Sequence, residues 1–202
     1  MKTISREDEY AFEVKRSRFI GRSFKAPSPA GALEIVKRVE NEFDDATHHC
    51  WAYRIGMSGE QARYDNSGEP QGTAGPPILD AIRHKDLTNT LVIVTRYYGG
   101  TKLGAGGLVR AYGEAAKKVL EESGHTELRM INEIRAPVPY NLLAPLENWL
   151  AREGFEIVAK EFGELVVLLL RVPIEREPDF RIFYSDLVNG KLAYTILGKK
   201  YI

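Results

Sequence analysis

Residues 65–113 read DNSGEPQGTAGPPILDAIRHKDLTNTLVIVTRYYGGTKLGAGGLVRAYG, and this stretch decides the fold. It places one glycine-rich loop ahead of an apolar strand and a second glycine-rich loop between that strand and a helix. Glycine has no Cβ and tolerates positive φ, so such loops can bring backbone close to a ligand. A helix start presents free N–H groups and partial positive charge, which suit an anion such as phosphate. We therefore expect the functional site in this segment.

The composition is that of an ordinary globular chain. Its 202 residues include 28 Lys and Arg and 28 Asp and Glu, so the formal net charge is zero. Such a chain does not coat nucleic acid indiscriminately, although a local basic patch is compatible with this balance. The single cysteine, Cys50, excludes an intrachain disulfide and favours a reducing compartment. The charged N-terminus lacks an apolar signal-peptide core. We expect a soluble, cytoplasmic protein with no membrane partner.

Hydrophobic periodicity predicts alternating strands and helices before residue 130. Residues 10–26 are expected to be extended, because aromatic and β-branched residues are frequent in them. Residues 58–74 are rich in turn-forming residues. The remaining expected elements are a helix at 29–43, a strand at 49–57, a helix at 76–85, a strand at 90–98 that is buried on both faces over 91–94, and a helix at 104–123.

After residue 130 the pattern becomes regular. It predicts a strand at 132–140, a helix at 142–153, strands at 155–161 and 165–172, a helix at 178–189 and a strand at 192–197. Pro145 suggests that the first of these helices begins near Ala144. The β-α-β-β-α-β order is the split arrangement of a ferredoxin-like domain. We therefore predict an α+β protein with two domains, residues 1–131 and residues 132–202.

The second glycine-rich loop, residues 99–107, is the strongest candidate site. It matches neither the P-loop pattern nor the Rossmann fingerprint. Arginine binds phosphate bidentately and lysine binds it as a point charge. The candidate nucleic-acid or phosphate-binding residues are the cations and glycines of this segment: Arg96, Gly99, Gly100, Lys102, Gly104, Gly106, Gly107 and Arg110. The alternative is that the glycines only permit tight packing of strand against helix.

The first glycine-rich loop, residues 65–75, offers Asp65, Glu69 and Thr73 as possible ligand-site residues. Two carboxylates four residues apart could serve as acid and base, or hold Mg²⁺ through waters. Turn formation explains residues 66–68 equally well. No catalytic residue can be assigned from this spacing.

The run DDATHHC at residues 44–50 suggests a metal site. Adjacent side chains on a strand point to opposite faces, so the His and Cys side chains cannot all converge on one ion. His48 and Cys50 share a face, but two ligands are too few. We therefore expect no metal site and no cofactor.

Residues 15–25 contain five cations and no acid: Lys15, Arg16, Arg18, Arg22 and Lys25. In an extended chain the three arginines lie on one face with Ile20 and Phe24. A basic strand with aromatic neighbours is typical of a nucleic-acid contact, so Lys15, Arg16 and Arg18 join the candidate binding residues. The alternative is a solvated edge strand protected by its charges.

Four motifs resemble the YigZ/IMPACT family. They are SRFI at residues 17–20, HCWAYR at 49–54, GEPxGTAG at 68–75 and RYYGGxxLGxGGLVRAY at 96–112. The resemblance covers essentially the whole chain and is of the bacterial two-domain type. One departure concerns two aspartates that usually precede the GEP sequence, where this chain has Asn66 and Ser67. The departure weakens any transfer of an acid or metal-binding role to those two positions.

The resemblance implies an N-terminal domain similar to domain 2 of ribosomal protein S5. It also implies a ferredoxin-like C-terminal domain similar to the last domains of elongation factor G. Eukaryotic relatives that share the N-terminal module regulate translation by binding a partner that activates an initiation-factor kinase. They lack this C-terminal domain, so their partner is not transferred to this chain. Both folds suggest contact with RNA or the ribosome by analogy.

Two hypotheses from different classes follow. In the first, the protein is a translation-associated regulator that binds RNA or the ribosome, contacting the phosphate backbone through the loop at 99–107 and the helix start. In the second, it is an enzyme that binds a nucleotide or phosphometabolite on the same loop, with the 65–75 loop lining the site. A third interpretation is a regulator that binds a protein partner of the translation machinery. Whether the chain is an enzyme depends on whether the two glycine-rich loops meet in space.

Overall fold

The computed structural model describes residues 1–201 and has two compact units, Met1–Glu127 and a second that begins at Leu128. The first unit contains β1 (Lys2–Ile4), β2 (Asp8–Val14), β3 (Ser17–Lys25), α1 (Pro29–Glu42), β4 (His48–Ile55), β5 (Gln61–Asp65), α2 (Gly75–His84), β6 (Thr90–Tyr97), α3 (Ala105–Glu122) and β7 (His125–Glu127). The second contains β8 (Met130–Val138), α4 (Tyr140–Glu153), β9 (Glu156–Phe162), β10 (Val166–Pro173), α5 (Glu177–Leu187) and β11 (Thr195–Tyr201). The predicted α+β class is confirmed.

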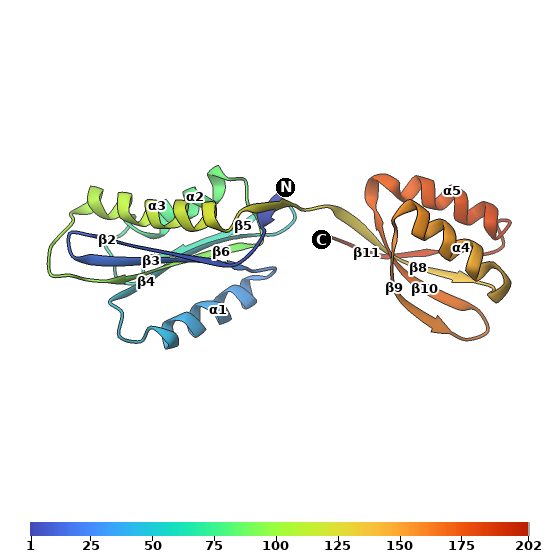
Figure 1. The fold of residues 1–202 in the computed structure, drawn as a ribbon, viewed down its shortest axis with the longest axis horizontal. Helices are drawn as coiled ribbons and strands as arrows, with labels where there is room; N and C mark the ends of the chain where they lie inside the picture. The colour runs from blue at the N-terminus through green and yellow to red at the C-terminus, as the bar shows by residue number, and fades with distance from the viewer. Residues whose placement is uncertain (202) are drawn as a thin grey trace. The chain divides into compact units, whose positions relative to one another are not determined.

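The first unit is built on a five-stranded antiparallel sheet in the order β2-β3-β6-β4-β5. Helices α2 and α3 cover one face of this sheet and α1 covers the other (Figure 1). On the central strand β6, Val92 and Val94 pack under α2 and α3, while Leu91 and Ile93 pack against α1. All four side chains are fully buried, as the apolar run predicts.

The prediction of one extended segment over residues 10–26 is wrong at its centre. Strands β2 and β3 form a hairpin in which Val14 pairs with Ser17, so Lys15 and Arg16 are its two turn residues. Both have positive φ, 47° and 65°, as a two-residue type I′ turn requires. Arg16 therefore does not share a strand face with the other arginines. Residues 58–74 are rich in turn-forming residues, but β5 also lies within them and was not predicted.

The second unit has the predicted β-α-β-β-α-β order. Its antiparallel sheet runs β11-β8-β10-β9, and α4 and α5 pack on one face of it (Figure 1). Alternate residues of β10 point into this core, and Phe180 and Tyr184 of α5 are buried against them. Among the described residues, no helix combines the length and apolar character needed to cross a membrane.

Two boundaries in the second unit differ from prediction. Helix α4 begins at Tyr140, so Pro145 lies inside it and does not mark its start. A proline six residues into a helix removes one backbone hydrogen bond, and burial of Leu146 and Leu150 in the core offsets that loss. The last strand lies at 195–201 and not at 192–197. Partly buried Leu192 and Tyr194 instead pack against the core ahead of the strand.

Gly21 lets α3 approach the centre of β3. A Cβ at Gly21 would lie 2.8 Å from the backbone carbonyl oxygen of Ala115 in α3. We expect Gly21→Ala to lower the free energy of unfolding by about 1–3 kcal/mol, because it forces strand and helix apart. The measurement is urea unfolding followed by Trp51 fluorescence in a Trp149→Phe background, which isolates the first unit.

The matched control is Gly106→Ala, also in this unit. A Cβ at Gly106 meets no atom within 4 Å, so we expect a change of less than about 1 kcal/mol. Equal stability of the Gly21 and Gly106 variants would contradict close strand–helix contact at Gly21.

Candidate functional site

A buried ion pair joins the first glycine-rich loop to the strand that precedes the second. Arg96, near the end of β6, places Nη1 2.5 Å from Oε1 of Glu69 in the first loop. The side chains are only 5% and 3% exposed to solvent. The pair therefore fixes the first loop against the strand from which the second loop leaves.

Three further groups complete the surroundings of this pair. The Tyr112 hydroxyl of α3 donates to the same Glu69 oxygen at 2.8 Å. Arg96 Nη2 donates to Ser17 Oγ at 3.2 Å, which adds the first residue of β3. His48 Nε2 lies 3.8 Å from Glu69 Oε1. Residues from β4, β6 and α3 thus lie against one carboxylate, and β3 joins them through Arg96.

This arrangement changes the role expected for Arg96. The sequence suggests it as a phosphate ligand, but its charge is buried and already balanced by Glu69. Its guanidinium also lies over the Phe19 and Tyr98 rings, 5.4 and 5.2 Å from their centroids. Arg96 is therefore a residue that positions the loops, and the cations around it must supply any charge offered to a large anion.

Cys50 and Tyr112 are also buried near Glu69. Burial raises the pKa of the Cys50 thiol to about 12, and the thiol donates to the Asn66 carbonyl at 2.9 Å. Burial also raises the pKa of the Tyr112 hydroxyl, with added repulsion from Cys50 and Glu69. Both groups are neutral at physiological pH, so Cys50 lacks the thiolate that a nucleophile needs. Within residues 1–201, no three or more His, Cys, Asp or Glu side chains form a cluster able to hold a metal ion.

Of the three candidates in the first loop, Glu69 contacts Arg96, while Asp65 and Thr73 bond within the loop. Asp65 is exposed, and its carboxylate accepts from the Ser67 amide at 2.6 Å. The Asn66 amide oxygen accepts from the Ala74 and Gly75 amides at 3.3 and 2.9 Å, at the start of α2. The Thr73 hydroxyl donates to the Pro70 carbonyl at 2.7 Å. The bond between Asp65 and the Ser67 amide agrees with the turn interpretation of residues 66–68. Thr73 bonds within the loop, and Asn66 supplies an acceptor as an aspartate would.

The second loop leaves the N-terminus of α3 uncapped by any side chain. The helix follows Gly104, whose φ is +75°, and its first backbone bond runs from the Leu108 amide to the Gly104 carbonyl at 3.0 Å. Gly106 and Gly107 lie in the first turn. Gly100 also has positive φ, +80°. The amides at the helix start are therefore available to an anion.

Gly99 places this loop against the β2–β3 turn. A Cβ on Gly99 would lie 1.8 Å from the Arg16 carbonyl oxygen, so no larger residue fits. The packing alternative therefore holds for Gly99. It does not explain Gly104 or Gly106, where a Cβ would meet no atom within 4 Å.

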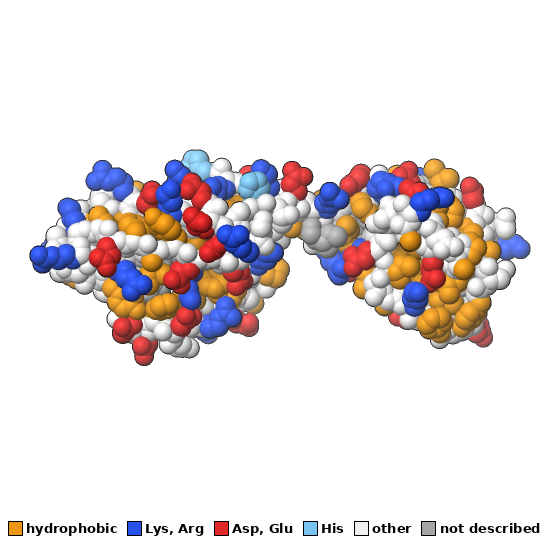
Figure 2. All heavy atoms as spheres, in the orientation of Figure 1, with side chains coloured by type: hydrophobic (Ala, Val, Ile, Leu, Met, Phe, Trp, Pro, Cys, Tyr) orange, Lys and Arg blue, Asp and Glu red, His pale blue; other side chains and the backbone are white. Residues whose placement is uncertain are grey.

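Four exposed cations lie near the start of α3, and we call them the basic tip: Lys15, Arg16, Lys102 and Arg110. Arg18 is also exposed, but it alternates in β3 with Phe19, which packs under α3, so its side chain lies on the opposite face of the sheet, as that of Arg22 does. None of the four tip cations forms an ion pair or a side-chain hydrogen bond within the described part of the chain. Arg22, by contrast, is bound by Glu9 and Glu42 at 2.9 and 2.8 Å. Figure 2 shows Lys and Arg side chains at the end of the first unit that carries the β2–β3 turn.

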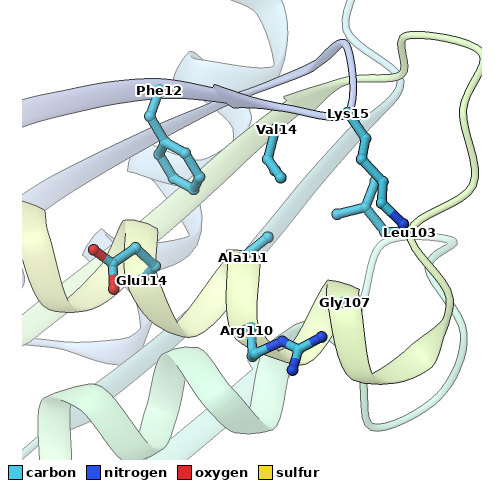
Figure 3. Close-up of a pocket in the computed structure, with 8 residues that line it drawn as sticks. All are labelled: Phe12, Val14, Lys15, Leu103, Gly107, Arg110, Ala111 and Glu114. Carbon is cyan, nitrogen blue, oxygen red and sulfur yellow. The ribbon is translucent and has the colours of Figure 1, made fainter.

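Two cavities lie on either side of Leu103. One, of about 340 Å³, is lined by Glu69, Arg96 and Lys102 together with the loop backbone at Gly104. The other, of about 420 Å³, is lined by Lys15 and Arg110 and by apolar side chains (Figure 3). Of the candidate residues, Glu69, Arg96, Lys102 and Gly104 line the first cavity, and Lys15, Gly107 and Arg110 line the second. The remaining candidates line neither: Asp65, Thr73, Gly99, Gly100, Gly106, Arg16 and Arg18.

Sequence reasoning missed Ser17, His48, Tyr98 and Tyr112 as neighbours of the ion pair. Tyr112 is on the apolar stripe of α3, where a tyrosine is expected to be core. A buried tyrosine hydroxyl needs a hydrogen-bond partner. This requirement alone could have indicated that Tyr112 has a polar neighbour. His48 and Ser17 gave no such indication, because their proximity to Glu69 depends on the pairing of four strands.

We expect the Arg96–Glu69 pair to behave as a coupled unit. Removing one member, by Arg96→Leu or Glu69→Leu, leaves a buried charge without a partner and should lower the free energy of unfolding by about 3–5 kcal/mol. The loss of unfolding free energy in the double variant should be at least about 2 kcal/mol smaller than the sum of the losses in the two single variants. Urea unfolding of all four proteins in the Trp149→Phe background measures this coupling. Additive single effects would contradict it.

Comparison with known proteins gives two family matches. Residues 15–120 match the Impact N-terminal domain, and residues 138–191 match a domain of unknown function, DUF1949. The crystal structure of a hypothetical protein superposes with a TM-score of 0.73 at 28% identity, covering 98% of this chain and 97% of that chain. The two-domain translational regulator Yih1 also matches, but its TM-score of 0.35 at 22% identity carries no argument.

Three curated bacterial proteins match over most of their length. IMPACT family member YvyE of Bacillus subtilis is 32% identical over 94% of this chain and 87% of that protein. YigZ of Escherichia coli is 31% identical over 89% of both proteins. The Thermus thermophilus member is 36% identical over 89% of this chain and 97% of that protein. The predicted resemblance is confirmed, and this chain belongs to the IMPACT family.

Proposed function

We propose that this protein is a translation-associated factor that binds RNA through the basic tip and the N-terminus of α3. The observation that carries the proposal is the set of four exposed cations around an uncapped helix start, none of which has an acidic partner among the described residues. Phosphate contacts from Lys, Arg and helix N-termini supply most of the affinity of sequence-independent binding. Membership of the IMPACT family supports the link to translational regulation at the level of the family.

The backbone of the β2–β3 turn gives independent support. Positive φ costs a non-glycine residue about 1–2 kcal/mol, and Asn-Gly is the usual sequence for such a turn. Here both positions are cations, Lys15 and Arg16. A strained backbone position that holds a residue poorly suited to it indicates that this residue serves a function. Lys and Arg can bind a polyanion through their positive charge, whereas Asn and Gly carry no charge with which to do so.

One observation favours a second candidate, a phosphorylated small molecule bound on the same loop. The two glycine-rich loops do meet, and the 340 Å³ cavity between them contains Lys102 and the start of α3. The Glu69 carboxylate at that cavity repels an anion, although Arg96 balances its charge. The experiments below separate this candidate from RNA binding, because a mononucleotide should then saturate the site.

Salt dependence tests the proposed surface. We expect a single-stranded RNA of about 12 nucleotides to bind with affinity that falls as salt rises. The triple variant Lys15→Gln/Lys102→Gln/Arg110→Gln should reduce the slope of log affinity against log salt by about 2, at about 0.7 for each phosphate that is no longer neutralised. Fluorescence anisotropy over a potassium chloride series measures both slopes.

The matched control removes three exposed lysines elsewhere in the same unit: Lys25→Gln/Lys37→Gln/Lys117→Gln. It has the same net charge as the test variant, and we expect its slope to be close to that of the wild type. Equal slopes for the two triple variants would show that only net charge matters and would refute the basic tip. If the wild type does not bind the RNA even at low salt, RNA binding itself is refuted.

The strained turn gives a second test. We expect Lys15→Asn/Arg16→Gly to raise the free energy of unfolding by up to about 1 kcal/mol, because these residues suit positive φ. The same variant should bind RNA more weakly. Urea unfolding and anisotropy on one protein preparation give both values. A variant that is less stable than the wild type, or that binds RNA equally well, would show that the turn cations are not retained for binding.

A further inference from the structure

The cavity beside the basic tip has a distinct chemistry at each end. Figure 3 shows Lys15, from the β2–β3 turn, and Arg110, from α3, at the end of the cavity near Leu103, with Glu114 at the other end. Arg110 and Glu114 are four residues apart on α3, about 6 Å along the helix axis. Their side chains point apart, and they do not form an ion pair with each other in the described structure. The cavity thus presents two cations and one carboxylate to the same ligand.

Between these ends the lining is apolar. Phe12 and Val14 of β2 lie on one side and Leu103 and Ala111 on the other (Figure 3). Phe12, Val14 and Leu103 are only partly buried, although they pack against the core. The volume of about 420 Å³ is within the range of small-molecule sites. An occupant should therefore carry an anionic group, a flat apolar body and hydrogen-bond donors at the far end.

We infer that this cavity binds one unstacked nucleotide of the RNA strand, with its phosphate at Lys15 and Arg110 and its base facing Glu114. The inference rests on the proposed function and adds a base preference to it. Sequence-selective recognition of RNA uses unstacked bases placed against aromatic side chains and bonded on their edges, and Phe12 offers the aromatic surface.

Glu114 determines which base fits. An ionised carboxylate only accepts hydrogen bonds. The Watson–Crick edge of guanine presents two adjacent donors, N1–H and the N2 amino group, so it can bind a carboxylate with both. Adenine and cytosine offer one amino donor beside an acceptor, and uracil offers one N–H between two carbonyl oxygens that a carboxylate repels. The cavity should therefore prefer guanosine and disfavour uridine.

The test compares an oligouridine of about eight residues with the same strand carrying one central guanosine. For the wild type we expect the guanosine strand to bind about 10-fold more tightly, since a good bidentate base contact discriminates by that order. Glu114→Gln should reduce this preference to less than about 2-fold, because it weakens the contact with guanosine and removes the repulsion of uridine, so oligouridine should bind to the variant no more weakly than to the wild type. Competition by free guanosine 5′-monophosphate is measured in parallel.

Two control variants separate the cavity from its surroundings. Glu13→Gln removes an exposed carboxylate from β2 near the tip, outside the cavity lining, and should keep the guanosine preference. Val14→Phe fills the cavity and should abolish the preference while keeping the salt slope. A thermal unfolding midpoint within a few degrees of the wild type establishes that each variant is folded.

The outcomes distinguish failure of the inference from failure of the proposed function. If neither strand binds the wild type, RNA binding fails. If both strands bind equally and the salt slope still depends on the basic tip, RNA binding stands and the nucleotide cavity is refuted. Loss of the preference in Glu13→Gln as well as Glu114→Gln would also refute it. Free monophosphate that competes as well as the oligomer would assign the cavity to a mononucleotide and overturn its assignment to RNA.

Discussion

The buried pair of Arg96 and Glu69 is the constraint on which the candidate site depends. It connects strand β6 to the first glycine-rich loop, and its hydrogen bonds extend to Ser17 of β3 and Tyr112 of α3. Taking two charges out of water costs several kcal/mol each, and their attraction repays this only when the geometry is good and further hydrogen bonds are made. A pair of this kind adds little net stability. Its effect is to fix which segments lie together, because any other arrangement leaves a charge buried alone.

That constraint separates the cations of this domain into two kinds. Arg96 is buried and neutralised, and Arg22 is held by two glutamates on the surface. The cations of the basic tip have no such partners among the described residues. A guanidinium committed to a buried carboxylate cannot also bind a diffusing anion without leaving that carboxylate unpaired. The exposed cations of the tip can do so without breaking an ion pair of the described structure.

Local patterns were sufficient to predict most elements. The β-α-β-β-α-β order, the doubly buried strand β6 and the helix after Gly104 all follow from periodicities that a few residues define. The β2–β3 turn could not be predicted, because Lys15 and Arg16 give none of the Asn or Gly signals that mark positive φ. The start of α4 was also misjudged, since core burial of Leu146 and Leu150 outweighs the proline penalty. The loops could be recognised as a candidate site, but whether Glu69 faces Arg96 depends on tertiary pairing that no local pattern encodes.

Helix α3 explains why a cavity lies beside the tip at all. One stripe of the helix, Leu108, Tyr112, Ala115 and Val119, is buried against the sheet and fixes the helix in place. The neighbouring stripe carries Gly107, Arg110, Ala111 and Glu114 at spacings of three and four residues, and faces β2. Its small members, Gly107 and Ala111, are too short to fill the space up to Phe12 and Val14. Larger residues there would extend the apolar core, as they do one stripe away. Ala111, between Arg110 and Glu114, and Gly107, one turn before Ala111, instead keep an apolar recess open to solvent, with charge at both ends of it.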